Sequence, residues 1–90
     1  MKMLRARAAQ QEARDPEREM SYDIAQQVFE GRTALGLTQG ELAARSGTKQ
    51  PAISGLESAK KLPTLGLLIR VAAALDRRLV IRFEKIKESE

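Results

Sequence analysis

Apolar residues recur every three or four positions in several stretches of this chain, and polar residues and glycines separate the stretches. In the first clear stretch, Ile24, Val28 and Leu35 fall on one face of a helix. Ser21 is its predicted N-cap, and Gly36 is its predicted stop because glycine readily adopts the left-handed backbone that ends helices. We therefore predict a helix from Ser21 to Leu35 with these three apolar side chains toward the core.

The next helix is predicted from the motif TQGE. Thr38 and Glu41 have the spacing of a capping box, in which each side chain accepts a hydrogen bond from the backbone N–H of the other. Leu37 precedes the cap, where it is placed for a hydrophobic staple. The helix is predicted to end near Gly47, which tolerates the backbone of a tight turn.

A third helix is predicted from Gln50 to Leu56, although it holds a proline and a glycine, the poorest helix formers. Pro51 costs little in the first turn, because its missing N–H has no acceptor within the helix there. Gly55 costs about 1 kcal/mol relative to alanine. The missing side chain at Gly55 leaves no cavity only if this position faces away from the core.

A last helix follows Pro63, with Thr64 as its predicted N-cap. Five apolar residues make its predicted core stripe: Leu65, Leu68, Ile69, Ala72 and Leu75. Leu67 and Val71 lie off that stripe, so we expect a second packing surface, for another subunit.

The segment RRLVIRFE changes from a helical repeat to the two-residue repeat of a strand. A lone strand leaves its backbone groups without partners, so we predict pairing with the same strand of a second copy. The alternative, a disordered tail, suits the residues after Lys85. The predicted dimer strand contains Leu79, Val80, Ile81, Arg82 and Phe83.

Composition narrows the function. The chain has 90 residues, 42% of them hydrophobic but only 3% aromatic, which favours a single aliphatic, helical core. It contains no Cys and no His, so thiolate chemistry, zinc clusters and His-based acid–base catalysis are excluded. We predict no enzymatic activity, no metal and no cofactor. No apolar run approaches the length of a membrane span, and no signal peptide is recognisable, so we expect a cytoplasmic protein without membrane contact.

The net charge is +4 and is unevenly distributed. Residues 48–70 carry four cationic side chains against Glu57 alone, whereas residues 21–47 carry three acidic side chains against two cationic ones. Such asymmetry suits a protein with one face toward a polyanion, although an ordinary solvated surface explains the charge equally well.

The stretch TQGELAARSGTKQPAISGLE resembles the helix-turn-helix of the Xre/Cro-type, lambda-repressor-like DNA-binding family. The resemblance covers about residues 24–76. In it Gln39 opens the first helix of the pair, Ala43 lies where the helices cross, and Gly47 makes the turn, while Ile53 and Leu56 anchor the second helix in the core.

The resemblance implies an all-α, lambda-repressor-like bundle of about five helices, with the C-terminal strand paired across a dimer. We expect the chain to divide into four parts. They are an N-terminal extension, either a weak helix or an arm (residues 1–20), the DNA-binding domain (residues 21–76), the strand (residues 77–84) and a disordered tail (residues 85–90).

The resemblance also implies roles in DNA binding. Gln39 would hold a phosphate and brace the recognition helix, and Gln50 is the leading base reader because an amide pairs with adenine N6 and N7. Lys49 would contact guanine or a phosphate. Lys60 and Lys61 would contact phosphates or serve only loop solubility. Pro51, Ala52 and Gly55 would also face the groove, where Gly55 either lets the backbone approach DNA or forfeits a contact.

Two further positions are structural in the family. Arg32 and Glu57 would form a bidentate ion pair between the first helix and the end of the recognition helix. Ala59 departs from the family pattern, because this loop position usually holds glycine, so we expect a different backbone there.

The flanks resemble HigA-type antitoxins of bacterial toxin–antitoxin pairs. This resemblance implies a homodimeric repressor that binds a palindromic operator in double-stranded DNA, regulates its own operon and neutralises an mRNA-cutting toxin of the RelE/HigB type. The toxin contact would come from the segment Leu4 to Arg18 or from helix surfaces away from DNA. The alternative is a stand-alone Xre-family or phage-type regulator without a toxin partner.

Overall fold

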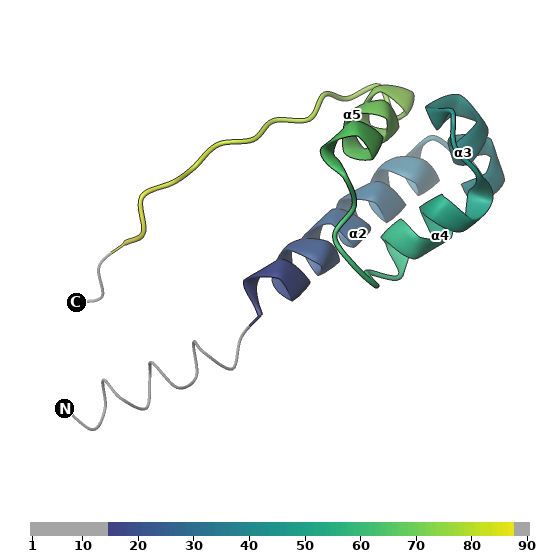
Figure 1. Cartoon of the computed structure of the whole chain (residues 1–90). Coiled ribbons are helices and arrows are strands. Elements are labelled where there is room, and N and C mark those ends of the chain that lie inside the picture. The colour runs from purple at the N-terminus through teal and green to yellow at the C-terminus, as the bar shows by residue number, and fades with distance from the viewer. Residues whose placement is uncertain (1–14, 88–90) are drawn as a thin grey trace.

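A computed structural model describes residues 15–87. This part is all-α, as predicted, and contains four helices and no strand: α2 (Pro16–Ala34), α3 (Gln39–Ser46), α4 (Gln50–Glu57) and α5 (Leu65–Ala74). The long α2 runs behind the three short helices, which gather around its C-terminal half (Figure 1). The prediction of about five helices is not supported by the described residues. Most of the predicted N-terminal extension, residues 1–14, lies outside them.

Helix α2 begins five residues earlier than predicted. Its N-cap is Asp15, whose carboxylate accepts hydrogen bonds from the backbone N–H groups of Glu17 (3.1 Å) and Arg18 (3.3 Å). Pro16 occupies the first helical position, where its fixed φ favours the helix and its missing N–H costs nothing. Ser21, the predicted cap, is instead buried inside the helix. The Asp-Pro pair that looks like a break is therefore a helix start.

The prediction of which residues of α2 face the core is confirmed in the middle of the helix and wrong at its C-terminal end. Val28 is buried, and Ile24 packs half-buried against the core. Leu35 is 41% exposed, because the helix has already ended at Ala34 and Leu35 serves as its C-cap. Gly36 follows with a φ of 69°, which confirms the predicted glycine stop.

The predicted caps of the middle helices are present. The hydroxyl of Thr38 accepts from the Glu41 N–H at 3.0 Å, and the Glu41 carboxylate accepts from the Thr38 N–H at 2.8 Å. Gly47 closes α3 with a φ of 72°, so the turn into α4 uses the left-handed backbone that only glycine adopts without strain.

One core cluster joins all four helices. It contains Val28, Leu42, Ala43, Ile53, Leu56, Val71 and Leu75. Leu42 and Ile53 are completely inaccessible to solvent, so α3 and α4 are fixed to each other by their apolar faces.

The predicted face of α5 is wrong in part. Thr64 caps the helix as predicted, accepting from the Leu67 N–H at 3.2 Å. Val71, placed off the core stripe, is the most buried residue of the helix, whereas Leu65 and Ile69, placed on the stripe, are each 57% exposed. Nearly every side chain of α5 is apolar, so its periodicity does not say which side packs inward. A second apolar surface exists, but it carries Leu65 and Ile69.

The predicted C-terminal strand is absent from the described chain. Residues 77–87 leave the end of α5 without regular structure and run along the direction of α2 as an extended trace (Figure 1). No other described segment offers backbone groups to this stretch, so an alternating sequence cannot become a strand within one copy. We call residues 77–87 the tail.

None of the helices in residues 15–87 combines the length and the apolar character that crossing a membrane requires.

Candidate nucleic-acid interface

The N-terminal end of α4 lies at the surface while its other side is anchored. Ile53 and Leu56 are buried against α3 and α2. Lys49, Gln50 and Pro51 are exposed at the start of the helix. Pro51 stands at the second helical position, where its missing N–H would have had no acceptor within the helix. The first turn of α4 is thus exposed to solvent, while the buried side chains of Ile53 and Leu56 fix the helix to the core.

Ala52 and Gly55 continue this surface along α4, each half-buried. A Cβ built on Gly55 would meet no atom within 4 Å. The predicted outward position of Gly55 therefore agrees with the space around it, and the side of α4 opposite the core is flat there.

A chain of hydrogen bonds links the exposed end of α4 to α2. The Gln50 amide nitrogen donates to the Gln39 amide oxygen at 2.7 Å, and the Gln39 amide nitrogen donates to Glu57 Oε1 at 3.0 Å. Glu57 in turn receives Arg32 Nε at 2.6 Å on Oε2 and Arg32 Nη2 at 3.0 Å on Oε1. The structure thus brings together four predicted site residues from α2, α3 and α4.

The inner half of this chain is an ion pair shielded from water. The side chains of Arg32 and Glu57 are only 14% and 8% exposed. Burial alone would raise the pKa of the Glu57 carboxyl, but hydrogen bonds from Arg32 and Gln39 outweigh it and hold that pKa below its ordinary 4.5. The hydrogen bond to Glu57 likewise raises the pKa of Arg32. Arg32 Nη1 also donates to the Leu37 carbonyl at 2.8 Å, which ties the pair to the loop before α3.

The outer half of the chain orients Gln50. With one N–H of the Gln50 amide directed at Gln39, the Gln50 oxygen and the second N–H remain on the exposed side. An acceptor and a donor side by side match the N6 amino group and N7 of adenine in the major groove. One N–H of the Gln39 amide has no acceptor in this chain of hydrogen bonds, because Glu57 takes only the other.

Three lysines lie at the two ends of α4. Lys49 caps the start of α4, and Lys60 and Lys61 lie exposed in the connection to α5. Within residues 15–87 no carboxylate forms an ion pair with any of them. Ala59, just before these lysines, has a φ of 57°. Alanine here adopts the left-handed conformation that glycine favours, and the predicted difference from the family's backbone stays a prediction.

Sequence reasoning predicted that Gln39 braces the recognition helix but did not identify its two hydrogen-bond partners there, Gln50 and Glu57. Gln39 and Gln50 each occupy the first position of a helix, 11 residues apart, and no periodic signal pairs such positions. It also missed the ring of Phe29, which lies 5.4 Å from the Arg32 guanidinium and covers it on α2. Among residues 15–87, no group of three or more acidic side chains is close enough to hold a metal ion.

A family model described as helix-turn-helix matches residues 29–81, which include α3, α4 and α5. This match covers more than half of the chain and places the glycine turn and the glutamine pair inside the motif. The chain belongs to the Xre-type helix-turn-helix family. Its members are DNA-binding transcriptional regulators.

Curated relatives agree with this membership. The chain is 43% identical over 63 residues to an uncharacterized HTH-type transcriptional regulator, y4dL, of Sinorhizobium fredii, and 46% identical over 48 residues to antitoxin HigA1 of Mycobacterium tuberculosis. These alignments cover 70% and 53% of the chain but only 32% of each relative. An HTH-type transcriptional regulator of Methanothermobacter thermautotrophicus is 48% identical over 50 residues, which are 56% of the chain and 72% of that protein.

Proposed function

We propose that this helix-turn-helix protein is a sequence-specific transcriptional repressor that reads operator bases with the start of α4. The supporting observation is the orientation of Gln50, whose amide is held by Gln39 and, through Glu57, by Arg32. A base reader fixed before binding loses little side-chain entropy when DNA arrives. Lys49 supplies a second contact, to guanine or to a phosphate.

Phosphate contacts fix the register of the helix on the duplex. In this proposal they come from Gln39 at the start of α3 and from Lys60 and Lys61 in the connection that follows the C-terminal end of α4. Pro51, Ala52 and Gly55 offer no side-chain donors, so few residues read bases directly and DNA shape contributes to the choice of site.

The test is a gel shift with the promoter of the protein's own operon, followed by footprinting. The wild type should protect a defined site. Gln50→Ala should bind mutated and native sites with more similar affinities, whereas Lys61→Ala should weaken all sites alike. An unchanged sequence preference in Gln50→Ala, with the melting temperature also unchanged, would rule out this role for Gln50.

We further infer that the DNA-binding unit is a homodimer on a palindromic operator. One recognition helix contacts too few bases to define a site, and two related by a two-fold axis would reach half-sites about 34 Å apart. The tail residues 79–83 are the proposed contact between the copies. Footprints on two half-sites one helical turn apart are the expected result.

We also propose that the protein is the antitoxin of a type II toxin–antitoxin pair and neutralises an mRNA-cutting toxin. Support comes from the similarity to antitoxin HigA1, which covers 53% of the chain. The alternative, a stand-alone Xre-family regulator without a toxin, is supported by the relatives named only as transcriptional regulators. The proposed toxin-binding segment, Leu4 to Arg18, lies mostly outside the described residues.

Co-expression separates these two functions. The protein is co-purified with the product of the neighbouring gene, and that product is tested for growth arrest and mRNA cleavage with and without the protein. A stable complex that abolishes cleavage supports the antitoxin. A neighbour that neither binds nor arrests growth leaves the stand-alone regulator.

A further inference from the structure

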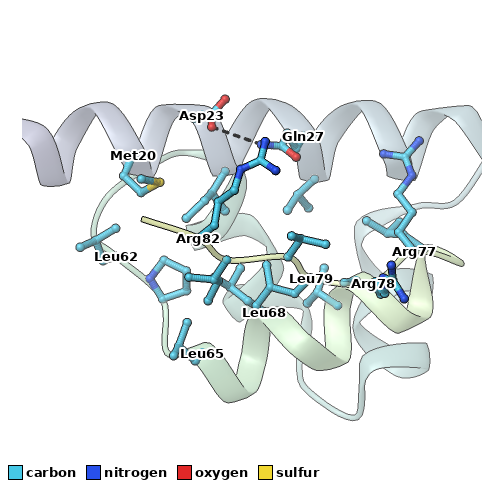
Figure 2. A pocket seen from close by; sticks show the side chains of 18 residues that line it. Met20, Asp23, Gln27, Leu62, Leu65, Leu68, Arg77, Arg78, Leu79 and Arg82 are labelled. Atoms are coloured by element: carbon cyan, nitrogen blue, oxygen red, sulfur yellow. Dashed lines mark hydrogen bonds between the residues drawn. The ribbon is translucent and has the colours of Figure 1, made fainter. Parts of the chain in front are cut away.

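An apolar groove of about 620 Å³ separates α2 from α5, on the side where the tail leaves the bundle (Figure 2). Met20 of α2 and Leu65 of α5 line it and are 53% and 57% exposed. The first six residues of the tail, Arg77 to Arg82, form part of its wall. The groove is therefore bounded by the tail but not filled by it.

Only part of the apolar surface of the tail lies against the groove. Leu79 is the one half-buried tail residue between Arg77 and Lys87, so the side of the tail that bears Leu79 faces the groove. Ile81 and Phe83 share that side in an extended chain. Phe83 lies beyond the groove wall and is fully exposed, at 101%. A large aromatic ring in water has no stabilising role within one copy.

The backbone N–H and C=O groups of the tail are also free to form hydrogen bonds with another chain. The last described backbone hydrogen bond before the C-terminus joins the Arg77 N–H to the Ala72 carbonyl, and residues 78–87 add none. An extended apolar segment with free N–H and C=O groups is a template for another strand.

We propose that the tails of two copies pair as antiparallel strands centred on Ile81, so that Phe83 of each copy fills the groove of the other beside Leu79. This inference rests on the proposed homodimer but not on DNA binding. It gives Phe83 a place that a single copy cannot offer. It also turns the two grooves into one continuous apolar interface across the two-fold axis.

Symmetry restricts the register. In an antiparallel pair, opposite residues lie on the same face, so a two-fold axis must place one residue directly opposite itself. With Ile81 at the axis, Leu79 faces Phe83 of the second copy, and Arg78 faces Glu84 of the second copy. Both matches occur twice, and each is a favourable cross-strand pair.

Neighbouring registers are poorer. With Val80 at the axis, Arg78 of each copy faces Arg82 of the other, and with Arg82 at the axis the two Arg82 side chains face each other. Like charges directly opposite are destabilising. With Phe83 at the axis, Ile81 faces Lys85 of the second copy, and neither groove receives an aromatic ring beside Leu79. Within residues 78–84, the charges and the position of Phe83 together favour Ile81 among these four registers, and the like-charged Arg77 and Lys85 face each other only beyond the ends of this segment.

Cysteine scanning tests the register, because the chain has no native cysteine. Single variants Val80→Cys, Ile81→Cys and Arg82→Cys of the full chain are oxidised and analysed for covalent dimers. Only Ile81→Cys should cross-link rapidly, since residues 80 and 82 would lie more than about 7 Å from their copies. Equal cross-linking at all three positions, or fastest cross-linking at 80 or 82, would overturn the proposed register.

Phe83→Ser and Ile86→Ser test the groove. Both residues are exposed, at 101% and 87%, but only Phe83 reaches the groove of the second copy in this register. Sedimentation should show a dimer dissociation constant at least about tenfold weaker for Phe83→Ser and unchanged for Ile86→Ser. Equal effects, or a monomeric wild type, would refute the proposal. A monomer that still binds a half-site would leave the DNA-binding function standing, so the two failures are distinguishable.

Discussion

At the scale of single residues, the recognition helix contains a glycine in a conformation that suits alanine. Gly55 lies within α4, and a Cβ there would meet no atom within 4 Å. Gly55→Ala should therefore raise the free energy of unfolding by about 1 kcal/mol. For a domain of this size the melting temperature should rise by about 4–8 °C.

Gly47→Ala is the matched control, because Gly47 has a φ of 72° and equal open space around it. Alanine there should lower the melting temperature, since its side chain disfavours the left-handed backbone. A lower melting temperature in Gly55→Ala as well would contradict the assigned geometry of α4. The operator affinity of Gly55→Ala then distinguishes the two roles predicted for this glycine. A lower affinity means that the backbone at Gly55 approaches the DNA closely. An unchanged affinity means that the glycine only lacks a side-chain contact to DNA.

A second residue-scale prediction concerns Glu57 and pH. Arg32 and Gln39 hold the pKa of Glu57 below its ordinary 4.5, so the unfolded chain binds this proton more readily than the folded protein. The resulting stabilisation is fully present above about pH 4.5 and is lost as the pH falls from there through the lower, folded-state pKa. The variant Glu57→Gln lacks this pH-dependent stabilisation, because its amide does not titrate.

Urea unfolding of both proteins measures this difference. The wild type should be clearly more stable than Glu57→Gln at neutral pH, and the gap should narrow toward about pH 3. A gap that stays constant between these conditions would show that Glu57 does not ionise differently in the folded protein.

At the scale of helices, the ion pair between Arg32 and Glu57 fastens α4 to α2. Arg32→Ala should cost about 2 kcal/mol or more, because it leaves a carboxylate that is 8% exposed without its cation. Arg82→Ala is the control, since the pair of Arg82 with Glu84 is 75% and 73% exposed and should contribute little. Thermal unfolding checks both variants, and equal melting temperatures would contradict the structural role of Arg32.

Sequence predicts the helices of this protein best where local chemistry defines them. The Thr38 capping box and the glycine turn at Gly47 involve neighbours in the chain, and both are present. The start of α2 was misplaced because an Asp-Pro pair serves both as a break and as a cap. The packing side of α5 was misplaced because leucines surround the helix, and only tertiary contact selects Val71.

At the scale of the whole molecule, the motif predicts which surface faces DNA but only part of how that surface is held together. The resemblance predicts the ion pair of Arg32 with Glu57 and a bracing role for Gln39. It does not predict that Gln39 and Gln50 join this pair to the surface. Their joining into one hydrogen-bonded chain depends on side-chain reach across the turn, which no spacing encodes. Likewise, an alternating segment predicts a strand, but a strand requires a partner that one copy does not contain.

The dependence of operator affinity on salt is a property of the entire assembly. Each lysine that neutralises a phosphate releases counterions, so the logarithm of affinity falls by about 0.9 per phosphate for each logarithmic unit of salt. A homodimer with Lys49, Lys60 and Lys61 on phosphates in both copies should give a slope of about −5. Lys61→Ala should make the slope shallower by about 2, one unit per copy, whereas Gln50→Ala should leave the slope unchanged and alter only sequence preference.

Titrations at several salt concentrations measure the slope for the wild type and both variants. A slope that Lys61→Ala leaves intact would remove this lysine from the interface, and a change of about one unit would indicate that a single copy binds.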